Sequence, residues 1–427
     1  MKICTISYHS CPFSLLGGDA NGGMSVYLKE LSASLACIPE VNIDIFTRIQ
    51  TPVVKGIKNI SSQVRVIHLK GGPEYPVDKR RVYDFLPEFS ENFEDYILRK
   101  KERYDLIFTH YWLSGLVGER IKFKYGLPLI HVYHTLAFFK KRALRNGEHI
   151  SRMRAEQHLA WVSDAIVSSS FEEKKNLIGE YGISPSKAKV IYPGVNPRLF
   201  FPIWNKEVYQ ETGWRESHRI LLYVGRIDPV KGLMTIVETF ELLKKRNRRL
   251  YDQLKLLVIG GGRKNIDLPK NDEFVLIEDV IRKNKLGDKI VFLGSRRQSQ
   301  LKSYYSAADA LVVPSLYESF GLVVIEALAC GTPVLVSRIG EMHTLVKEGK
   351  NGFSFRSNDP PSLAYCLENF FCHKERLWGS QMMRQDIINK FSWKKTAEQT
   401  YRIFTDIKRR GTNTTTIFQP DESLQPI

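Results

Sequence analysis

Residues 310–326 read Ala310-Leu-Val-Val-Pro-Ser315-Leu-Tyr-Glu318-Ser-Phe-Gly321-Leu-Val-Val-Ile-Glu326. The apolar start predicts a buried strand, Glu318 falls in the loop after it, and Gly321 marks the start of a helix. This order brings both glutamates beside the free N–H groups of a helix N-terminus, which attract anions. Carboxylates in turn accept hydrogen bonds from sugar hydroxyls. The stretch therefore predicts a site that holds a sugar and a nucleotide at once.

The two carboxylates have separate expected roles. Glu326 lies one to two turns inside the predicted helix, on roughly the face of Leu322 and Ile325, and we expect it to be an exposed charge that faces a cleft. Glu318 precedes the helix and can reach a different part of the ligand. The alternative is that Glu318 solvates a loop and that Glu326 is an ordinary charge on a helix surface.

Short apolar runs alternate with helical stretches along both halves of the chain. Near-continuous apolar strands flanked by helices are typical of parallel sheets covered on both faces. We therefore predict an α/β fold with two Rossmann-like domains that face each other across a cleft. The predicted strands are Lys2–Ser7, Val41–Thr47, Val64–His68, Leu106–Thr109, Pro128–Tyr133, Ala165–Ser169 and Lys189–Tyr192, then Arg219–Val224, Lys255–Ile259, Lys289–Leu293, Ala310–Pro314 and Pro333–Val336.

The length of 427 residues also favours more than one domain, because single hydrophobic cores stop growing below that size. The junction falls at Tyr192–Pro202, where three prolines and a glycine interrupt any helix or strand. We assign residues 1–195 to an N-terminal domain and residues 203–385 to a C-terminal domain. Residues 386–408 should form a helix that packs back toward the first domain, and the polar residues 409–427 a disordered tail.

The chain carries a formal charge of +17, spread over both halves rather than gathered in one tail. Phosphorylated ligands, an anionic membrane surface or nucleic acid would suit such a field, and solvated helix faces are the simpler explanation. No RNA- or DNA-binding signature accompanies the charge, so we expect no nucleic-acid partner. The basic clusters are Lys79-Arg80-Arg81, Arg99-Lys100-Lys101, Lys140-Lys141-Arg142 and Lys244-Lys245-Arg246.

No window approaches the roughly 18 to 20 uninterrupted apolar residues of a membrane span. The start, Lys2–Ser7, resembles a buried strand rather than a signal peptide.

The six cysteines show no Cys-x-x-Cys pairing, and Cys4, Cys330 and Cys366 lie in apolar runs, as buried thiols in a reducing compartment do. We expect a cytoplasmic protein, with the inner face of the membrane as an alternative location. The sequence leaves the oligomeric state open.

Ligands of open parallel sheets bind outside the carboxyl ends of the strands, so the loops there are candidate sites. A glycine-rich turn at Gly17–Gly23 follows the first strand and opens a helix, where a phosphate could approach the backbone. A mere tight turn is the alternative. Another glycine run, Gly260–Gly262, follows a later strand. His134 also ends a strand, and that position favours the cleft over the core placement usual for a lone histidine.

A further loop reads Gly225-Arg226-Ile-Asp228-Pro-Val-Lys231-Gly232, after the strand that opens the second domain. Arg226 and Lys231 project from this one loop and could clamp a diphosphate from two sides. The chain shows no Asp-x-Asp pair and no His/Cys cluster for a metal. Because these metal-binding patterns are absent, we expect cationic side chains, rather than a magnesium ion, to neutralise the diphosphate. The alternative is that Asp228 caps a helix beside ordinary surface cations.

Seven short motifs occur in order along the chain. They are Gly22-Gly23-Met-Ser-Val-Tyr, His110-Tyr-Trp-Leu-Ser-Gly115, His134-Thr135, Tyr192-Pro-Gly-Val195, Gly225-Arg226…Lys231-Gly232, Glu318…Glu326 and Phe391-Ser-Trp393. Together, from about residue 1 to residue 408, they resemble the retaining glycosyltransferases of family 4, which have the GT-B fold. The first half is most similar to the branch that holds sucrose-phosphate synthases and D-inositol-3-phosphate glycosyltransferases.

The resemblance implies transfer of a hexosyl group from a nucleotide-diphosphate sugar to an acceptor hydroxyl. The donor would be UDP-linked as in that branch, although GDP-mannose donors occur in the family. The first domain would lie on the acceptor side and the second would bind the nucleotide sugar. Neither a cofactor nor an essential metal is implied.

The resemblance also assigns donor-site residues by position. Arg226 and Lys231 would hold the diphosphate, Glu326 the ribose, and Glu318 the donor sugar, while His134 would bind that sugar near the reaction centre. The implied catalytic set is His134, Arg226, Lys231 and Glu318. The implied donor site is Gly23, Arg226, Lys231, Glu318, Phe320, Gly321, Leu322 and Glu326, with Gly23 approaching the diphosphate and backbone amides around Phe320, Gly321 and Leu322 assisting.

For the acceptor, the inositol-phosphate branch implies a phosphate grip. The matching residues are Lys79, Tyr111, Thr135 and Arg152. Ser25 stands where the branch has an asparagine, so the acceptor remains open. One alternative makes Arg152 part of a solvated helix face with Arg154. Another is a lipid or polysaccharide acceptor, with the basic surface docked on an anionic membrane.

Two rival enzyme classes share parts of this pattern. A GT-B epimerase or nucleotide-sugar hydrolase would use the donor site but needs no acceptor pocket, so Lys79 and Arg152 argue against it. A nicotinamide dehydrogenase would also use Rossmann-like units, but no Gly-x-Gly-x-x-Gly with an acidic residue about 20 residues on is present. In a retaining transfer the acceptor hydroxyl would give its proton to the departing diphosphate, whose charge Arg226 and Lys231 would stabilise.

Overall fold

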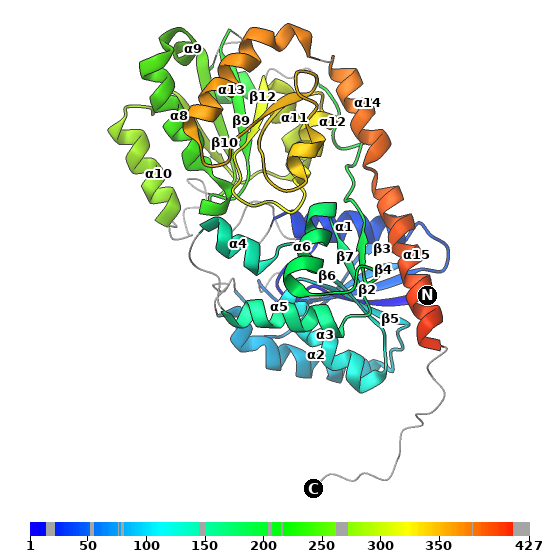
Figure 1. Cartoon of the computed structure of the whole chain (residues 1–427). Helices are drawn as coiled ribbons and strands as arrows, with labels where there is room; N and C mark the ends of the chain where they lie inside the picture. Colours follow the sequence, from blue (N-terminus) through cyan, green and yellow to red (C-terminus); the bar gives the residue numbers. More distant parts are fainter. Residues whose placement is uncertain are drawn as a thin grey trace, which may run out of the picture.

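The chain folds into two α/β domains, which the computed structural model shows at the bottom and top of Figure 1. It describes residues 1–13, 22–51, 55–75, 77, 81–144, 150–203, 207–214, 217–261, 272–377 and 379–412. Each domain is built on one sheet with helices on both faces. The predicted fold class, two Rossmann-like domains, is confirmed.

The first domain contains an eight-stranded sheet with the order β3-β4-β2-β1-β5-β6-β7-β8. Neighbouring strands pair in parallel except β3, which pairs antiparallel with β4. The sequence did not predict β3, because its exposed, polar residues lack the apolar run of a core strand. The strands are β1 Lys2–Ile6, β2 Asn42–Arg48, β3 Gly56–Ser61, β4 Val64–Leu69, β5 Leu106–His110, β6 Leu129–Val132, β7 Ala165–Ser168 and β8 Ala188–Val190.

Helices cover both faces of this sheet, because successive strand residues point to opposite sides. Ile3 packs with residues of α1 and α15, whereas its neighbour Cys4 packs with residues of α2, α3 and α5. The two layers are mainly apolar, which explains the near-continuous hydrophobic runs of the strands. The helices here are α1 Gly23–Leu35, α2 Leu86–Lys100, α3 Trp112–Tyr125, α4 Ala137–Leu144, α5 Ile150–Val162 and α6 Phe171–Tyr181, with the 3-10 turn η1 Val82–Phe85.

The second domain contains a six-stranded parallel sheet with the order β11-β10-β9-β12-β13-β14. Only β14 was not predicted. Its four residues read Gly-Phe-Ser-Phe, so they lack the continuous apolar run of the other strands. The strands are β9 Arg219–Val224, β10 Leu254–Ile259, β11 Ile290–Gly294, β12 Ala310–Val313, β13 Val334–Ser337 and β14 Gly352–Phe355. The helices are α7 Glu207–Thr212, α8 Leu233–Arg246, α9 Arg248–Gln253, α10 Asp272–Lys283, α11 Gln298–Ala307, α12 Leu322–Ala329, α13 Pro360–His373 and α14 Ser380–Lys390, with η2 Pro229–Lys231, η3 Met342–Leu345 and η4 Lys374–Arg376.

Each sheet reverses its strand order at one place. In the first sheet the reversal lies between β1 and β5, and in the second between β9 and β12. Loops that leave the carboxyl ends of such strands diverge and leave space for a ligand. The predicted donor loops 225–232 and 315–321 follow β9 and β12 directly. The strand order thus brings together two segments that are far apart in the sequence.

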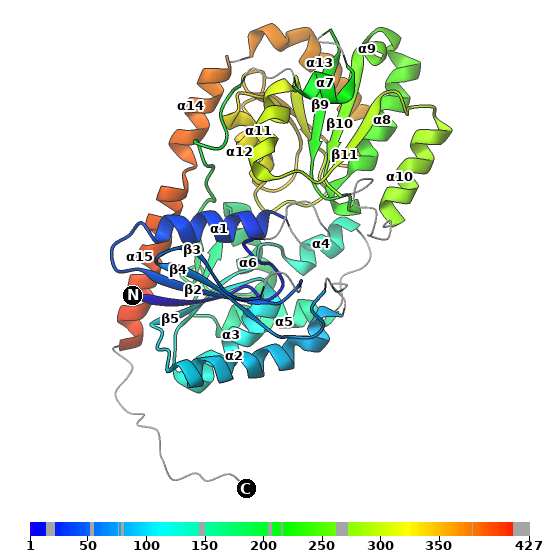
Figure 2. The same ribbon diagram turned by 180° about the vertical axis from the view of Figure 1, so that it is seen from behind.

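The chain crosses between the domains twice, and the two crossings bond to each other. Val195 N–H donates to Phe391 O at 3.1 Å, and Thr396 Oγ1 donates to Tyr192 O at 2.8 Å. Figure 2 shows α14 beside the second domain and the final helix, α15 Trp393–Thr412, beside α1 of the first. The second crossing therefore falls between α14 and α15.

Two details of the predicted C-terminus need correction. The single helix expected over 386–408 is two helices, with a break at Phe391 and Ser392 that lets the chain change domains. Helix α15 continues to Thr412, so residues 409–412 are helical rather than part of a disordered tail, and the helix is anchored by Phe404 and Ile407, which pack in the core of the first domain. The rest of the predicted tail, 413–427, lies outside the described residues.

None of the described helices is both long and apolar enough to cross a membrane. All six cysteines are free thiols, and Cys4, Cys330 and Cys366 are buried as predicted.

Candidate functional site

Two helix N-termini from different domains meet at the predicted donor site. Gly321 precedes α12 with φ of 93°, a left-handed conformation that favours glycine, so the helix can start directly after the loop. Gly23 opens α1, and a Cβ there would lie 3.2 Å from Leu322 Cδ1. The first turns of both helices leave backbone N–H groups without helical partners, and such groups bind anions. Gly23, Gly321 and Leu322 are thus brought together.

The loop after β9 supplies one cation to this place. Lys231 Nζ lies 2.5 Å from Glu318 Oε2, which joins the two donor loops of the second domain. Arg226 Nη1 lies 3.4 Å from Asp228 Oδ2 in the same loop. Asp228 also accepts a hydrogen bond from Val230 N–H at 3.1 Å, so it does cap a short helix as the alternative interpretation held. Capping and charge coexist, because the cap fixes the turn that carries Lys231.

Glu326 differs from the sequence prediction. Its side chain is not an exposed charge: it is only 6% exposed and accepts hydrogen bonds from Tyr305 Oη at 2.9 Å and Gln298 Nε2 at 3.3 Å. Burial raises the pKa of Glu326 to about 7, although both hydrogen bonds act in the opposite direction. Tyr305 and Gln298 were not predicted as site residues. No signal in the sequence pairs them with Glu326.

The raised pKa of Glu326 leads to a stability prediction. In the unfolded chain this carboxyl ionises near its ordinary value of 4.5, whereas in the fold it ionises near 7. The fold therefore favours the protonated form of Glu326. Its contribution to the free energy of unfolding is full below pH 4.5 and is lost as the pH rises through 7. Glu326→Gln removes the ionisation and should raise the free energy of unfolding at pH 8 by up to about 3 kcal/mol, but change it little at pH 4.5.

Urea unfolding of Glu326→Gln and of the wild type at both pH values measures this difference. Glu91→Gln, an exposed carboxyl on α2, serves as the control that should show no such pH dependence. An equal effect of Glu326→Gln at the two pH values would contradict the burial of an ionisable group at this position.

His134 is held by a second histidine. Its Nε2 lies 3.0 Å from Nδ1 of fully buried His110, and its backbone has φ of 62°, which is strained for a residue with a side chain. Burial lowers the pKa of His134 to about 3 and that of His110 well below its usual value. Both imidazoles are therefore neutral near pH 7, and His134 can offer hydrogen bonds but not a proton for acid catalysis. His110 belonged to a quoted motif but was not predicted as a site residue.

Three of the four predicted acceptor residues form one cluster, and the solvated-face alternative for Arg152 is wrong. Arg152 is 5% exposed and its Nη2 donates to both Thr135 O and Thr135 Oγ1 at 3.0 Å. Its guanidinium lies over the Tyr111 ring, 4.8 Å from the centroid. Its Nε bonds Glu156 Oε1 at 2.8 Å, a partner that the sequence analysis missed although the i, i+4 spacing signals it. Lys79 lies outside the described residues.

Ser25, which departs from the expected asparagine, points into the first domain. Its hydroxyl lies 2.7 Å from Ser10 Oγ, and both serines are buried. The pair ties the start of α1 to the segment after β1. The described contacts of Ser25 are thus internal to the first domain.

The sequence matches two family models, "Glycosyltransferase Family 4" over residues 21–199 and "Glycosyl transferases group 1" over residues 205–376. The D-inositol 3-phosphate glycosyltransferase 2 of Catenulispora acidiphila is 31% identical over 408 residues, which cover 94% of each chain. The chain belongs to glycosyltransferase family 4. It is therefore a glycosyltransferase, and the residues above are its candidate active site.

Solved structures agree with this fold. The sucrose-phosphate synthase of Thermosynechococcus elongatus superposes with a TM-score of 0.86 at 28% identity and covers 96% of this chain and 99% of its own. Alr3699/HepE of Anabaena superposes with a TM-score of 0.72, covering 95% of this glycosyltransferase and 100% of its own chain. At 17% identity that second likeness shows the fold alone.

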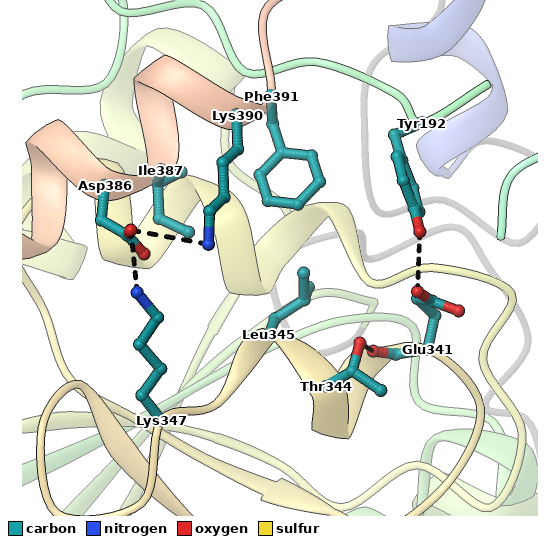
Figure 3. A pocket seen from close by; sticks show the side chains of 9 residues that line it. All are labelled: Tyr192, Glu341, Thr344, Leu345, Lys347, Asp386, Ile387, Lys390 and Phe391. Atoms are coloured by element: carbon teal, nitrogen blue, oxygen red, sulfur yellow. Dashed lines mark hydrogen bonds and ion pairs between the residues drawn. The ribbon is translucent and has the colours of Figure 1, made fainter. Parts of the chain in front are cut away.

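A pocket of about 360 Å³ lies at the domain crossings rather than at the predicted donor residues. Figure 3 shows Tyr192 from the first crossing, whose hydroxyl donates to Glu341 Oε1 at 2.9 Å, and Phe391 from the second. The ring of Phe320 contacts both, with centroids 5.8 Å from Tyr192 and 5.5 Å from Phe391, which lie 5.6 Å from each other. Phe320, predicted for its backbone amide, thus packs its side chain against both domain crossings of this glycosyltransferase.

Proposed function

We propose that this family 4 glycosyltransferase moves a hexosyl group from a UDP-linked sugar to a hydroxyl of a phosphorylated small molecule, with retention of anomeric configuration. The observation that carries the proposal is the meeting of Lys231, Glu318 and the two helix N-termini at one place. A cation and free N–H groups suit a diphosphate, and a carboxylate suits sugar hydroxyls. The relatives named as inositol-phosphate glycosyltransferases, and the Anabaena protein in complex with UDP and glucose, support this donor and acceptor class.

In this mechanism the acceptor oxygen bonds to the anomeric carbon on the face that the diphosphate leaves. The bond from that carbon to the diphosphate oxygen breaks, and the acceptor proton passes to the departing oxygen. Lys231 and Arg226 stabilise the negative charge that develops there. His134, in its neutral form, and Glu318 hold the sugar through hydrogen bonds. Glu326 accepts hydrogen bonds from the ribose hydroxyls. No step needs a carboxylate nucleophile.

The proposal includes no essential metal, because cationic side chains take its place at the diphosphate. Among the described residues, no group of three or more His, Cys, Asp or Glu side chains is arranged to hold a metal ion. Transfer should therefore persist after dialysis against EDTA, within about twofold of the untreated rate. Complete loss on chelation, with recovery on addition of magnesium or manganese, would show that the diphosphate needs a metal.

The function itself is tested by incubating the protein with radiolabelled UDP- and GDP-sugars, each with and without phosphorylated polyols. Transfer from a UDP-sugar that requires the acceptor phosphate supports the proposal. Transfer only to lipid or polysaccharide acceptors in the presence of anionic vesicles would favour the membrane-docked alternative. Release of free sugar or an epimerised nucleotide sugar, without any transfer, would point to the hydrolase or epimerase class.

A further inference from the structure

Two side chains that flank Glu318 reach across to the first domain. Ser319 Oγ donates to His134 O at 2.6 Å, and Tyr317 Oη accepts from Leu136 N–H at 2.9 Å. Neither residue was predicted as part of the site. The contacts join residues more than 180 positions apart in the chain.

These contacts form one directed chain of hydrogen bonds. The Ser319 hydroxyl has one proton, which it donates to His134 O. In the hydrogen bond between Tyr317 Oη and Ser319 Oγ, which are 3.4 Å apart, Tyr317 is therefore the donor and Ser319 the acceptor. The order is then Leu136 N–H to Tyr317, Tyr317 to Ser319, and Ser319 to His134 O. Burial raises the pKa of Tyr317, which keeps its hydroxyl protonated and able to donate.

The residues between the bonded pairs point away from the contact, each into its own domain. Glu318, between Tyr317 and Ser319, pairs with Lys231. Thr135, between His134 and Leu136, accepts hydrogen bonds from Arg152. The chain of hydrogen bonds therefore sets the candidate donor pair and the candidate acceptor pair in a fixed position relative to one another.

The same contacts act on the strained residue of the site. His134 has φ of 62°, and such a conformation persists only where the surroundings hold it. Its carbonyl is held from the second domain by Ser319 and its imidazole from the first domain by His110. A rotation of one domain away from the other would break the Ser319 contact and release one of these two restraints.

We propose that Tyr317 and Ser319 form an interdomain latch that positions His134 against Glu318 when the domains are closed. The two residues are positioning residues, and their effect on transfer rests on the proposed function. Closure excludes water from a reacting centre, so the latch should favour transfer over hydrolysis of the donor. UDP itself would be held by the loops of the second domain, whose contacts the latch does not make.

The test compares the wild type with Tyr317→Phe, Ser319→Ala and the double variant, each of which deletes only hydroxyl groups. Small-angle X-ray scattering, with and without saturating UDP, measures closure without any activity. We expect a larger radius of gyration in the double variant than in the wild type. Tyr365→Phe, an exposed tyrosine of the second domain, should match the wild type. Coincident scattering profiles of the double variant and the wild type would overturn the latch.

Kinetics then test positioning. Each single variant should lose transfer about tenfold or more, the double variant little beyond that, and hydrolysis should rise relative to transfer while the UDP dissociation constant stays within about twofold. Ser319→Thr, which keeps the hydroxyl, should recover most of the rate. An unchanged ratio of transfer to hydrolysis would overturn the positioning role. A wild type that transfers no sugar would contradict the proposed function instead, and scattering would still decide the latch.

Discussion

Lys231→Ala should lower turnover about 10²–10³-fold while the protein stays folded. Lys231 is the cation that the structure places against Glu318, at the meeting point of the two helix N-termini. Loss of one preorganised positive group removes stabilisation that matters most as charge develops on the departing diphosphate. The fold should survive because the lysine side chain is 23% exposed and Glu318 keeps partial access to water. Activity with a UDP-sugar and circular dichroism measure the two effects.

The matched control is Lys245→Ala. Lys245 lies on α8 of the same domain, pairs with Glu241 at 2.8 Å and has a side chain that is 73% exposed. An exposed pair of this kind contributes little, so its loss should leave turnover and stability nearly unchanged. Wild-type turnover in a folded Lys231→Ala variant would remove the proposed donor site.

The sequence predicted the fold and pointed to the loops of the candidate site because both depend on local signals. Apolar runs bounded by glycine and proline predicted twelve of the strands, and the strand order then brought loops 225–232 and 315–321 together. The two strands that were not predicted, β3 and β14, lack a continuous apolar run. The resemblance assigned Lys231 and Glu318 to one donor site, but their contact across 87 positions was not predicted, because it depends on the strand order.

Side-chain directions and interdomain contacts could not be predicted in this way. The segment Leu322–Ala329 is apolar on nearly every face, so its periodicity does not show which side is buried, and the burial of Glu326 was missed. Tyr317 and Ser319 are ordinary loop residues by composition. Their role depends on the relative placement of two domains, which no pattern within one domain encodes.

The candidate acceptor cluster gives the other large expected effect. Arg152→Ala should destabilise the protein by about 3–5 kcal/mol, because it leaves Glu156 as a buried carboxylate without its cationic partner. Glu156 has no exposed surface, and burial raises its pKa even with the arginine present. Arg154→Ala, an exposed position on the same helix, should change little. Thermal and urea unfolding measure the difference, and equal stability of the two variants would contradict the buried pair.

Stability alone does not tell whether Arg152 binds substrate, so a second variant must separate the two roles. Arg152→Met combined with Glu156→Gln removes both charges, leaves no buried ion unpaired, and should restore most of the stability. If Arg152 also grips an acceptor phosphate, this folded double variant still lacks a charge-assisted contact of about 1.5–3 kcal/mol, and the acceptor KM should rise about tenfold to a hundredfold at unchanged donor affinity. If the arginine only holds Thr135 and Glu156 in place, a phosphorylated acceptor should show its ordinary KM. The second result would place the acceptor phosphate elsewhere and favour a lipid or polysaccharide acceptor, because the buried guanidinium would then have no ligand to recognise.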